Sequence, residues 1–123
     1  MKDFDKWNEI KKKVEGVSER ILFNEGEIWW CDVGLNIGSE QDGPSPLFER
    51  PMFIAKKFSD RVMLAFPITS RCKVGNYYYK LDAHNTVILC QPKLIDAKRL
   101  KRFIRQLSRS QTKEITSKFK GLL

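Results

Sequence analysis

The sequence predicts a mainly β fold, a small and strongly bent barrel with an N-terminal helix and C-terminal helices attached at its ends. Short strand-like runs follow one another through the middle of the chain, with turn residues between them, and helical spacing of apolar residues is confined to the two ends. The chain has 123 residues, 41% hydrophobic and 31% charged, which suits one domain with a buried core.

The first expected element is a short amphipathic helix over residues 3–15. Phe4, Trp7, Ile10 and Val14 recur there at helical spacing, and Gly16 follows as a stop signal. Residues 1–20 are therefore interpreted as a helical extension that precedes the β-rich part of the chain.

Five strand-like runs come next. They are rich in β-branched and aromatic residues, and turn residues such as Ser59-Asp60 and Asp82-Ala83-His84-Asn85 separate them. The runs cover residues 27–33, 50–58, 61–67, 76–81 and 86–90. The single histidine, His84, falls in a turn, which favours a solvated turn residue over an acid or base.

A long loop is expected between the first two runs. Residues 38–46 contain two glycines and two prolines, a composition that a strand does not tolerate. Loops of this length in small domains usually carry function or are disordered. Ser39, Glu40 and Gln41 lie side by side in it and suit hydrogen bonding to nucleotide edges or to a partner peptide. Arg50 stands where the chain returns to the sheet, and its guanidinium is expected to point back under the loop.

Helical spacing returns at Asp96. Two apolar stripes predict two C-terminal helices, one from Asp96 to Leu107 and one over residues 110–123. The first stripe is Leu100, Phe103, Ile104 and Leu107, and the second is Ile115, Phe119 and Leu122.

The net charge of +8 comes entirely from the C-terminal quarter of the chain. Residues 1–92 carry 13 basic and 13 acidic side chains, whereas residues 93–123 carry 10 basic and 2 acidic ones. Such a patch attracts polyanions, either nucleic acid or an acidic protein. A helix with a basic solvent face is an equally good interpretation of the charge alone.

Cysteine usage and hydropathy exclude several classes of protein. The three cysteines form no C-x-x-C pair, so structural disulfides and a zinc site are not expected. No apolar run approaches the roughly 20 residues that cross a bilayer, and the N-terminus lacks a signal-peptide pattern. We therefore expect a cytoplasmic protein with no membrane partner.

Five motifs, in order, resemble those of the MazF/PemK toxin family. They are Gly26-Glu27-Ile28-Trp29-Trp30, Gly38-Ser39-Glu40-Gln41-x-Gly43, Arg50-Pro51 with Met52-Phe53-Ile54-Ala55, Pro67-Ile68-Thr69-Ser70, and Gln91-Pro92-Lys93-x-Ile95-Asp96. The resemblance covers about residues 24–107. One such motif is weak evidence, but the ordered series is specific.

The resemblance implies a fold and an activity. The fold is an SH3-like barrel of the MazF/PemK or CcdB type, with residues 1–123 as a single domain, 24–107 as the family core and 108–123 as a C-terminal helix. The activity is that of an mRNA interferase, a sequence-specific endoribonuclease that needs no metal or other cofactor. It leaves a 2′,3′-cyclic phosphate and a 5′-hydroxyl on single-stranded mRNA. The implied partners are a cognate acidic antitoxin and a second copy of the chain in a homodimer.

The resemblance also implies the site residues. Arg50, Thr69 and Ser70 would act at the scissile phosphate, where a guanidinium fork and a hydroxyl position phosphate oxygens. The implied RNA-binding residues are Gly38, Ser39, Glu40, Gln41, Arg71, Gln91 and Lys93.

Two positions depart from the family pattern. Cys90 stands where several members have an acidic residue, and Lys93 stands where they have arginine. A thiol is a poor base unless it is acidified, and lysine lacks the bidentate fork. Glu40 or Asp42 would substitute as proton acceptor. The alternatives are a catalytically weak or inactive binding module for nucleic acid or protein, and a gyrase-directed toxin on the same fold.

Overall fold

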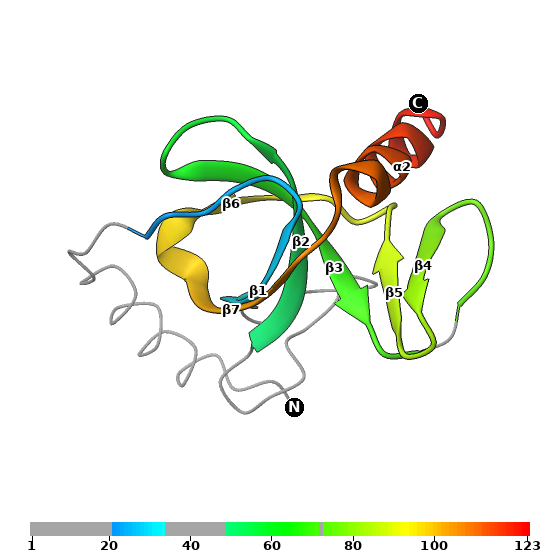
Figure 1. Cartoon of the computed structure of the whole chain (residues 1–123), viewed down its shortest axis with the longest axis horizontal. Coiled ribbons are helices and arrows are strands. Elements are labelled where there is room, and N and C mark those ends of the chain that lie inside the picture. The colour runs from blue at the N-terminus through cyan, green and yellow to red at the C-terminus, as the bar shows by residue number, and fades with distance from the viewer. Residues whose placement is uncertain (1–20, 34–48, 72) are drawn as a thin grey trace.

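The structure is a computed structural model that describes residues 21–33, 49–71 and 73–123. Over these residues the chain is mainly β with one C-terminal α-helix, which confirms the predicted fold class (Figure 1). The elements are β1 (Glu27–Asp32), β2 (Glu49–Lys57), β3 (Val62–Thr69), β4 (Tyr78–Asp82), β5 (Asn85–Ile88), β6 (Lys93–Asp96), the 3-10 helix η1 (Ala97–Arg99), β7 (Leu100–Gln106) and α2 (Arg109–Lys120). The expected helix over 3–15 and the loop over 38–46 lie outside the described residues.

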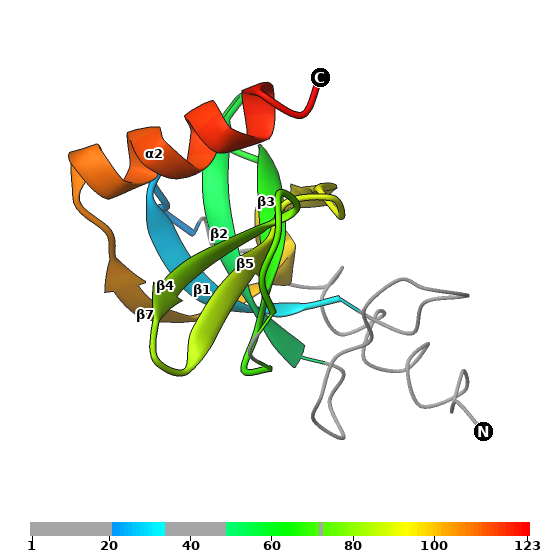
Figure 2. The same cartoon turned by 90° about the vertical axis from the view of Figure 1, so that its right-hand side faces the viewer.

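The strands form one antiparallel sheet in the order β4-β5-β3-β2-β1-β7, and β6 pairs with β3. The long strands β2 and β3 form the middle of this sheet. Figure 1 shows β1, β2, β6 and β7 curving into a ring, while the β4–β5 hairpin stands to one side. Figure 2 shows α2 lying across one end of the ring, above β4 and β5.

Alternate residues along the strands fill two cores, because successive side chains point to opposite faces of a sheet. One core is enclosed by the ring of strands and consists of Phe23, Cys31, Met52, Ile54, Met63, Ala65, Ile95, Ala97 and Leu100. The other lies under α2 and the β4–β5 hairpin and consists of Ile28, Phe53, Ala55, Phe66, Ile68, Val87, Leu89, Leu107 and Ile115. Strand β2 contributes to both cores and so joins them.

The C-terminal helix confirms the prediction for residues 110–123. The side chain of Ser108 caps α2 by accepting a hydrogen bond from the Gln111 backbone N–H at 3.1 Å. Ile115 is fully buried, and Phe119 packs edge-on against Phe66 with 4.9 Å between the ring centroids. Within the described part of the chain, no helix is long and apolar enough to span a membrane.

The helix predicted from Asp96 to Leu107 is wrong, because this segment forms η1 and strand β7. Strand β7 pairs with β1, but the register shifts twice, so that Lys101 and Ile104 have no partner on β1. Each bulge adds one residue and breaks the alternation of a regular strand. The apolar residues of β7 therefore recur with a spacing that imitates a helix. The short strand β6 was also not predicted.

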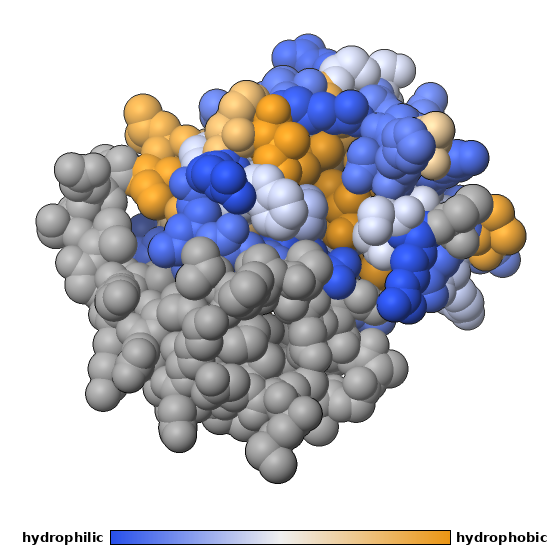
Figure 3. Space-filling model, turned by 90° about the horizontal axis from the view of Figure 1, so that it is seen from below, coloured by the Kyte–Doolittle hydropathy of each residue, from blue (hydrophilic) through white to orange (hydrophobic). Residues whose placement is uncertain are grey.

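Several large apolar side chains remain exposed on the described residues. In Figure 3 apolar surface is interspersed with hydrophilic side chains on the face seen from below. The exposed residues are Leu22, Phe58, Val74, Tyr77, Leu94, Phe103, Ile104 and Leu123. Phe103 and Ile104 are neighbours on β7, and β7 pairs only with β1 among the described strands. This edge of the sheet is thus partly apolar.

Gly26 joins the start of β1 to the junction of β7 and α2. Its N–H donates to Ile54 O at 2.8 Å, and its carbonyl accepts from the Leu107 N–H at 2.9 Å. Its φ is +88°, in the left-handed region that favours glycine. A Cβ at this position would lie 2.7 Å from both Gln106 Nε2 and Thr112 Oγ1. The close approach of three segments therefore depends on a residue without a side chain.

We expect Gly26→Ala to destabilise the fold by about 2 kcal/mol, because it combines a strained φ with two steric overlaps. Urea unfolding followed by circular dichroism measures the change. Gly121→Ala is the matched control: Gly121 has a right-handed φ of −65°, which alanine adopts without strain, so its substitution should not destabilise the fold. Equal stability of the two variants would contradict this account of the junction.

Candidate active site

The structure brings the predicted residues Arg50 and Thr69 together at one end of β2 and β3. Met52 pairs with Pro67, and continuing this antiparallel register by two residues sets Arg50 opposite Thr69. The Arg50 guanidinium reaches from β2 to β3 and donates from Nη1 to Ile68 O at 3.0 Å. Arg50 also pairs with Cys31 on β1, so its backbone is held by the neighbouring strand.

Thr69 is also fixed by contacts with neighbouring residues. The residue is 6% exposed and pairs with Thr86 on β5. Its Oγ1 accepts a hydrogen bond from the Arg71 backbone N–H at 3.2 Å. Ser70 and Arg71 follow directly and are exposed. This end of the sheet therefore offers a guanidinium, two hydroxyls and a second arginine in a short stretch of surface.

A cluster of charged side chains that the sequence did not reveal lies beside this pair. Asp32, at the end of β1, is 1% exposed, and its Oδ2 lies 3.0 Å from Lys101 Nζ. Glu49 stands opposite Asp32 on β2 and forms an ion pair with Arg102 at 3.5 Å. Two acidic residues that face each other across strands repel, and each is offset here by a basic side chain from β7.

Burial is the main cause of the shifted pKa values of Cys31 and Asp32, at the end of β1. It raises the pKa of the Asp32 carboxyl, and the hydrogen bond and positive charge of Lys101 act against that rise. Burial also raises the pKa of the Cys31 thiol strongly, with the Asp32 charge adding to the rise. Cys31 therefore stays a thiol at neutral pH and does not act as a nucleophile or base.

The exposed edge of this cluster is aromatic and basic. Arg102 lies over the Trp30 ring with 5.4 Å between its guanidinium carbon and the ring centroid. Trp29 meets Phe103 edge to face at 5.8 Å between centroids. These contacts tie β7 to β1 through side chains where the bulges interrupt the regular pairing.

The remaining predicted residues lie elsewhere or outside the described residues. Lys93 pairs with Ala65 on β3, four residues from Thr69, which is roughly 13 Å along the strand. Gln91 lies two residues before Lys93, at the approach to β6. Gly38, Ser39, Glu40 and Gln41 lie outside the described residues. No group of three or more His, Cys, Asp and Glu side chains is placed to hold a metal ion in the ranges that the structure describes.

The turn containing His84 is as predicted. The His84 N–H donates to Asp82 Oδ1 at 2.8 Å, and the residue is exposed. This hydrogen bond, together with that from the Asn85 side chain, lowers the pKa of Asp82. His84 belongs to a hairpin turn, and in the described residues it is not part of the Arg50–Thr69 site.

A comparison with family models shows the family to which the chain belongs. The model of a family described as PemK-like, MazF-like toxin of type II toxin-antitoxin system matches residues 24–123. The chain belongs to this family. The matched range includes both Arg50 and Thr69 and extends to the end of α2.

Solved structures share the fold of this PemK/MazF-family chain. MazF (Form-I) from Deinococcus radiodurans is 19% identical, with a TM-score of 0.62 over 83% of this chain and 96% of that chain. MazE–MazF (Form-II) from the same organism is 16% identical, with a TM-score of 0.60 over 83% and 95%. An endoribonuclease in complex with its cognate antitoxin from a Mycobacterial species is 10% identical, with a TM-score of 0.61 over 79% and 90%. At these identities the likeness establishes the fold alone.

The buried pair of Asp32 and Lys101 gives a pH-dependent prediction. We expect Lys101→Met to destabilise the fold by about 2 kcal/mol at pH 7, because it leaves a buried carboxylate without its counter-charge. Since burial raises the Asp32 pKa, protonation favours the folded state. The loss of unfolding free energy in Lys101→Met relative to wild type should therefore shrink as the pH falls through the folded-state pKa of Asp32 in that variant.

Urea unfolding of both proteins at several pH values measures this difference. The double variant Asp32→Asn, Lys101→Met is the control, because it has no buried charge and its loss of stability relative to wild type should not shrink as the pH falls. A deficit in Lys101→Met that stays constant with pH would mean that lost packing, and not the charge on Asp32, is responsible.

Proposed function

We propose that this chain is a sequence-specific endoribonuclease that cleaves single-stranded mRNA without a metal ion. The products would be a 2′,3′-cyclic phosphate and a 5′-hydroxyl, as expected when the 2′-oxygen attacks the adjacent phosphorus. The observation that carries the proposal is the hydrogen bond from Arg50 to the carbonyl of Ile68, the residue before Thr69, in a chain that belongs to the PemK/MazF family.

The geometry suits stabilisation of charge on a phosphate. A guanidinium has five N–H donors in a rigid plane, and the bond from Arg50 to Ile68 O holds it at the residue that precedes Thr69. In our proposal, the Arg50 fork and the Thr69 hydroxyl bind the non-bridging oxygens, where negative charge grows as the phosphorane forms. Ser70, next to Thr69 and exposed, would assist in holding the phosphate in line.

Proton transfer needs a base for the 2′-hydroxyl and an acid for the departing 5′-oxygen. Cys90 takes the position at which several family members have an acidic residue. Glu40 and Asp42, in the segment between β1 and β2, are the carboxylates that we propose in its place. Asp32 is excluded from this role, because its carboxyl is buried and paired with Lys101.

RNA and an acidic antitoxin are the proposed polyanionic partners. The residues proposed to contact RNA are Gly38, Ser39, Glu40, Gln41, Arg71, Gln91 and Lys93. The basic residues of β7 and α2 supply the attraction for both partners, since residues 93–123 hold the whole net charge of +8. The antitoxin would present an acidic, partly disordered segment that folds over the basic surface and covers Arg50.

A homodimer is also part of the proposal, and its interface is proposed to include the exposed apolar stretch of β7. Phe103 is 51% exposed, and Ile104 beside it is 39% exposed. Burying two such side chains against a second copy gives a favourable contribution of a few kcal/mol. Phe103 also contacts Trp29, so the interface would lie next to the charged cluster at the end of β1.

We expect Arg50→Ala and Thr69→Val each to lower the rate of RNA cleavage by about 100-fold or more, because each removes a group that stabilises transition-state charge. The assay incubates purified protein with a long defined RNA in EDTA and maps the cut sites and end groups by primer extension. Arg61→Ala is the matched control: Arg61 is exposed at the β2–β3 turn, and its loss should leave cleavage unchanged.

The same assay separates the alternative functions. Intact RNA with wild type, together with retained binding in a gel shift, would reject cleavage and favour the binding module suggested by Cys90 and Lys93. Growth arrest in a bacterial host with intact RNA would favour a gyrase-directed toxin. Cleavage abolished by EDTA would reject the metal-independent mechanism.

We expect the double variant Phe103→Ser, Ile104→Ser to weaken dimerisation by about tenfold or more, because it removes the apolar area that association would bury. Sedimentation velocity over a range of protein concentrations measures the dissociation constant. Val74→Ser is the control, because Val74 is exposed and belongs to the connection between β3 and β4, not to β7. If both variants dimerise as wild type does, β7 does not form the interface.

A further inference from the structure

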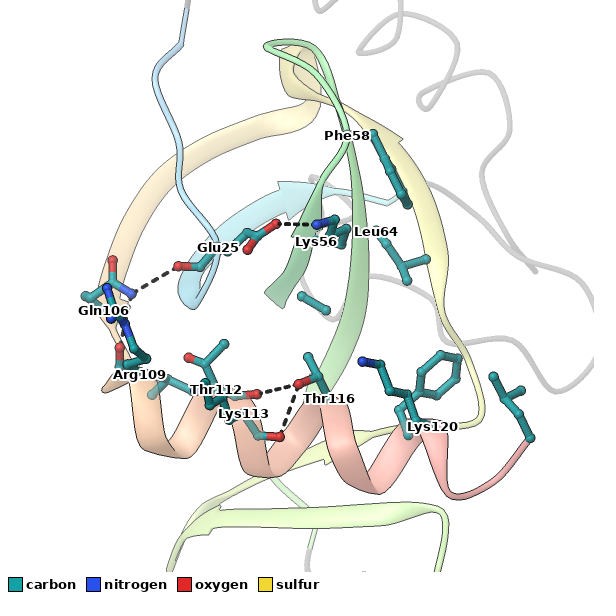
Figure 4. A pocket seen from close by; sticks show the side chains of 14 residues that line it. Glu25, Lys56, Phe58, Leu64, Gln106, Arg109, Thr112, Lys113, Thr116 and Lys120 are labelled. Carbon is teal, nitrogen blue, oxygen red and sulfur yellow. Dashed lines mark hydrogen bonds and ion pairs between the residues drawn. The ribbon is translucent and has the colours of Figure 1, made fainter.

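A groove of about 900 Å³ lies between α2 and the end of β2. In Figure 4 Glu25 and Lys56 lie on the barrel side, and Thr112, Thr116 and Lys120 on the α2 side. We name it the α2 groove. Its lining residues are Glu25, Ala55, Lys56, Phe58, Leu64, Gln106, Leu107, Arg109, Thr112, Lys113, Thr116, Phe119, Lys120 and Leu123.

The inner surface of the α2 groove is apolar. Leu64 and Phe119 are half-buried in its wall, and Ala55 and Leu107 are buried at its base. Two further lining side chains are exposed to solvent, since Phe58 is 57% exposed and Leu123 is 90% exposed. Apolar surface left in contact with water at a concave site favours association with an apolar partner.

The rim of the groove is basic. Arg109, Lys113 and Lys120 are exposed on α2. The ion pairs found among the described residues involve none of the three. The acidic residue in the lining, Glu25, is already 3.7 Å from Lys56 Nζ. Four basic side chains therefore surround an apolar trough that contains one carboxylate.

The opposite flank of α2 is occupied by contacts within the chain. Glu114, the acidic residue of α2, accepts a hydrogen bond from the Tyr79 hydroxyl at 2.6 Å, and Lys118 donates to the Tyr78 carbonyl. Because this flank is attached to β4, the basic side chains on the groove side are the ones that remain available to a partner.

We propose that the α2 groove binds an acidic amphipathic segment of a protein partner. The partner's apolar side chains would occupy the trough, and its carboxylates would pair with Arg109, Lys113 and Lys120. The aliphatic surface formed by Ala55 and Leu107 at the base and Leu64 in the wall suits leucine-like side chains better than it suits the flat faces of nucleotide bases.

The groove is separate from the Arg50–Thr69 site. Lys56 follows Arg50 by six residues on β2, which is roughly 20 Å along the strand. A segment in the α2 groove would therefore bind this chain without covering Arg50. The inference goes beyond the proposed function and does not require RNA cleavage, so a test of binding alone is sufficient.

The experiment measures fluorescence anisotropy of a labelled synthetic peptide of glutamate, leucine and alanine, with leucines at helical spacing. A second peptide of the same composition in scrambled order reports on charge alone. We expect Lys113→Glu to weaken binding of the amphipathic peptide by about tenfold, and Phe58→Ser by about fivefold. Lys80→Glu is the matched control, because Lys80 is exposed on β4, outside the groove, and its reversal changes net charge equally.

Three results would overturn the proposal. Equal binding of the two peptides, or equal weakening by Lys113→Glu and Lys80→Glu, would mean diffuse attraction to a basic protein. Displacement of the peptide by single-stranded RNA, with RNA binding lost in Lys113→Glu, would assign the groove to nucleic acid. A dimer disrupted by Phe58→Ser would assign it to a second copy. Superimposable thermal unfolding curves for all variants establish that lost binding is not lost folding.

Discussion

The hydrogen bond from Arg50 to the Ile68 carbonyl depends on the register of β2 against β3, and the rest of the site depends on the same register. Continuing the pairing of Met52 with Pro67 sets Pro51 opposite Ile68. Proline has no N–H, so it cannot donate to that carbonyl, and the Arg50 side chain donates to it instead. A shift of one residue would turn Arg50 to the other face of the sheet and separate it from Thr69.

The packing and the charges around β2 both disfavour a shift in its register against β1 and β3. Strand β2 lies between β1 and β3 and supplies buried side chains to both cores, so a slip would expose apolar residues on one face and bury polar ones on the other. At its first residue, Glu49 faces Asp32, and the two carboxylates are matched by Arg102 and Lys101 of β7. The site thus rests on the β2–β3 hairpin together with β1 and β7, which are far apart in sequence.

Most of the strands could be predicted from sequence, and the failures have physical causes. The runs that became β1 to β5 were evident because composition and turn residues mark them. Strand β7 was predicted as a helix because its bulges at Lys101 and Ile104 alter the apolar period. That error also concealed the Asp32–Lys101 pair, whose partners lie 69 positions apart and meet only if β7 is a strand.

Arg50 and Thr69 were identified through family motifs, whereas their alignment across β2 and β3 needed the register. Lys93 was grouped with them by motif, although the pairing of β6 with β3 sets it several residues away.

The two bulges of β7 also disfavour aggregation of the protein through this edge of the sheet. A straight edge strand offers a continuous row of backbone donors and acceptors, and such rows template the growth of cross-β aggregates. In β7 the row is interrupted twice within seven residues, and lysine and arginine side chains lie along it. An added strand could not keep one register over that length. The irregularity that makes β7 hard to recognise in the sequence thus lets the edge carry exposed Phe103 and Ile104 with little risk of fibril growth.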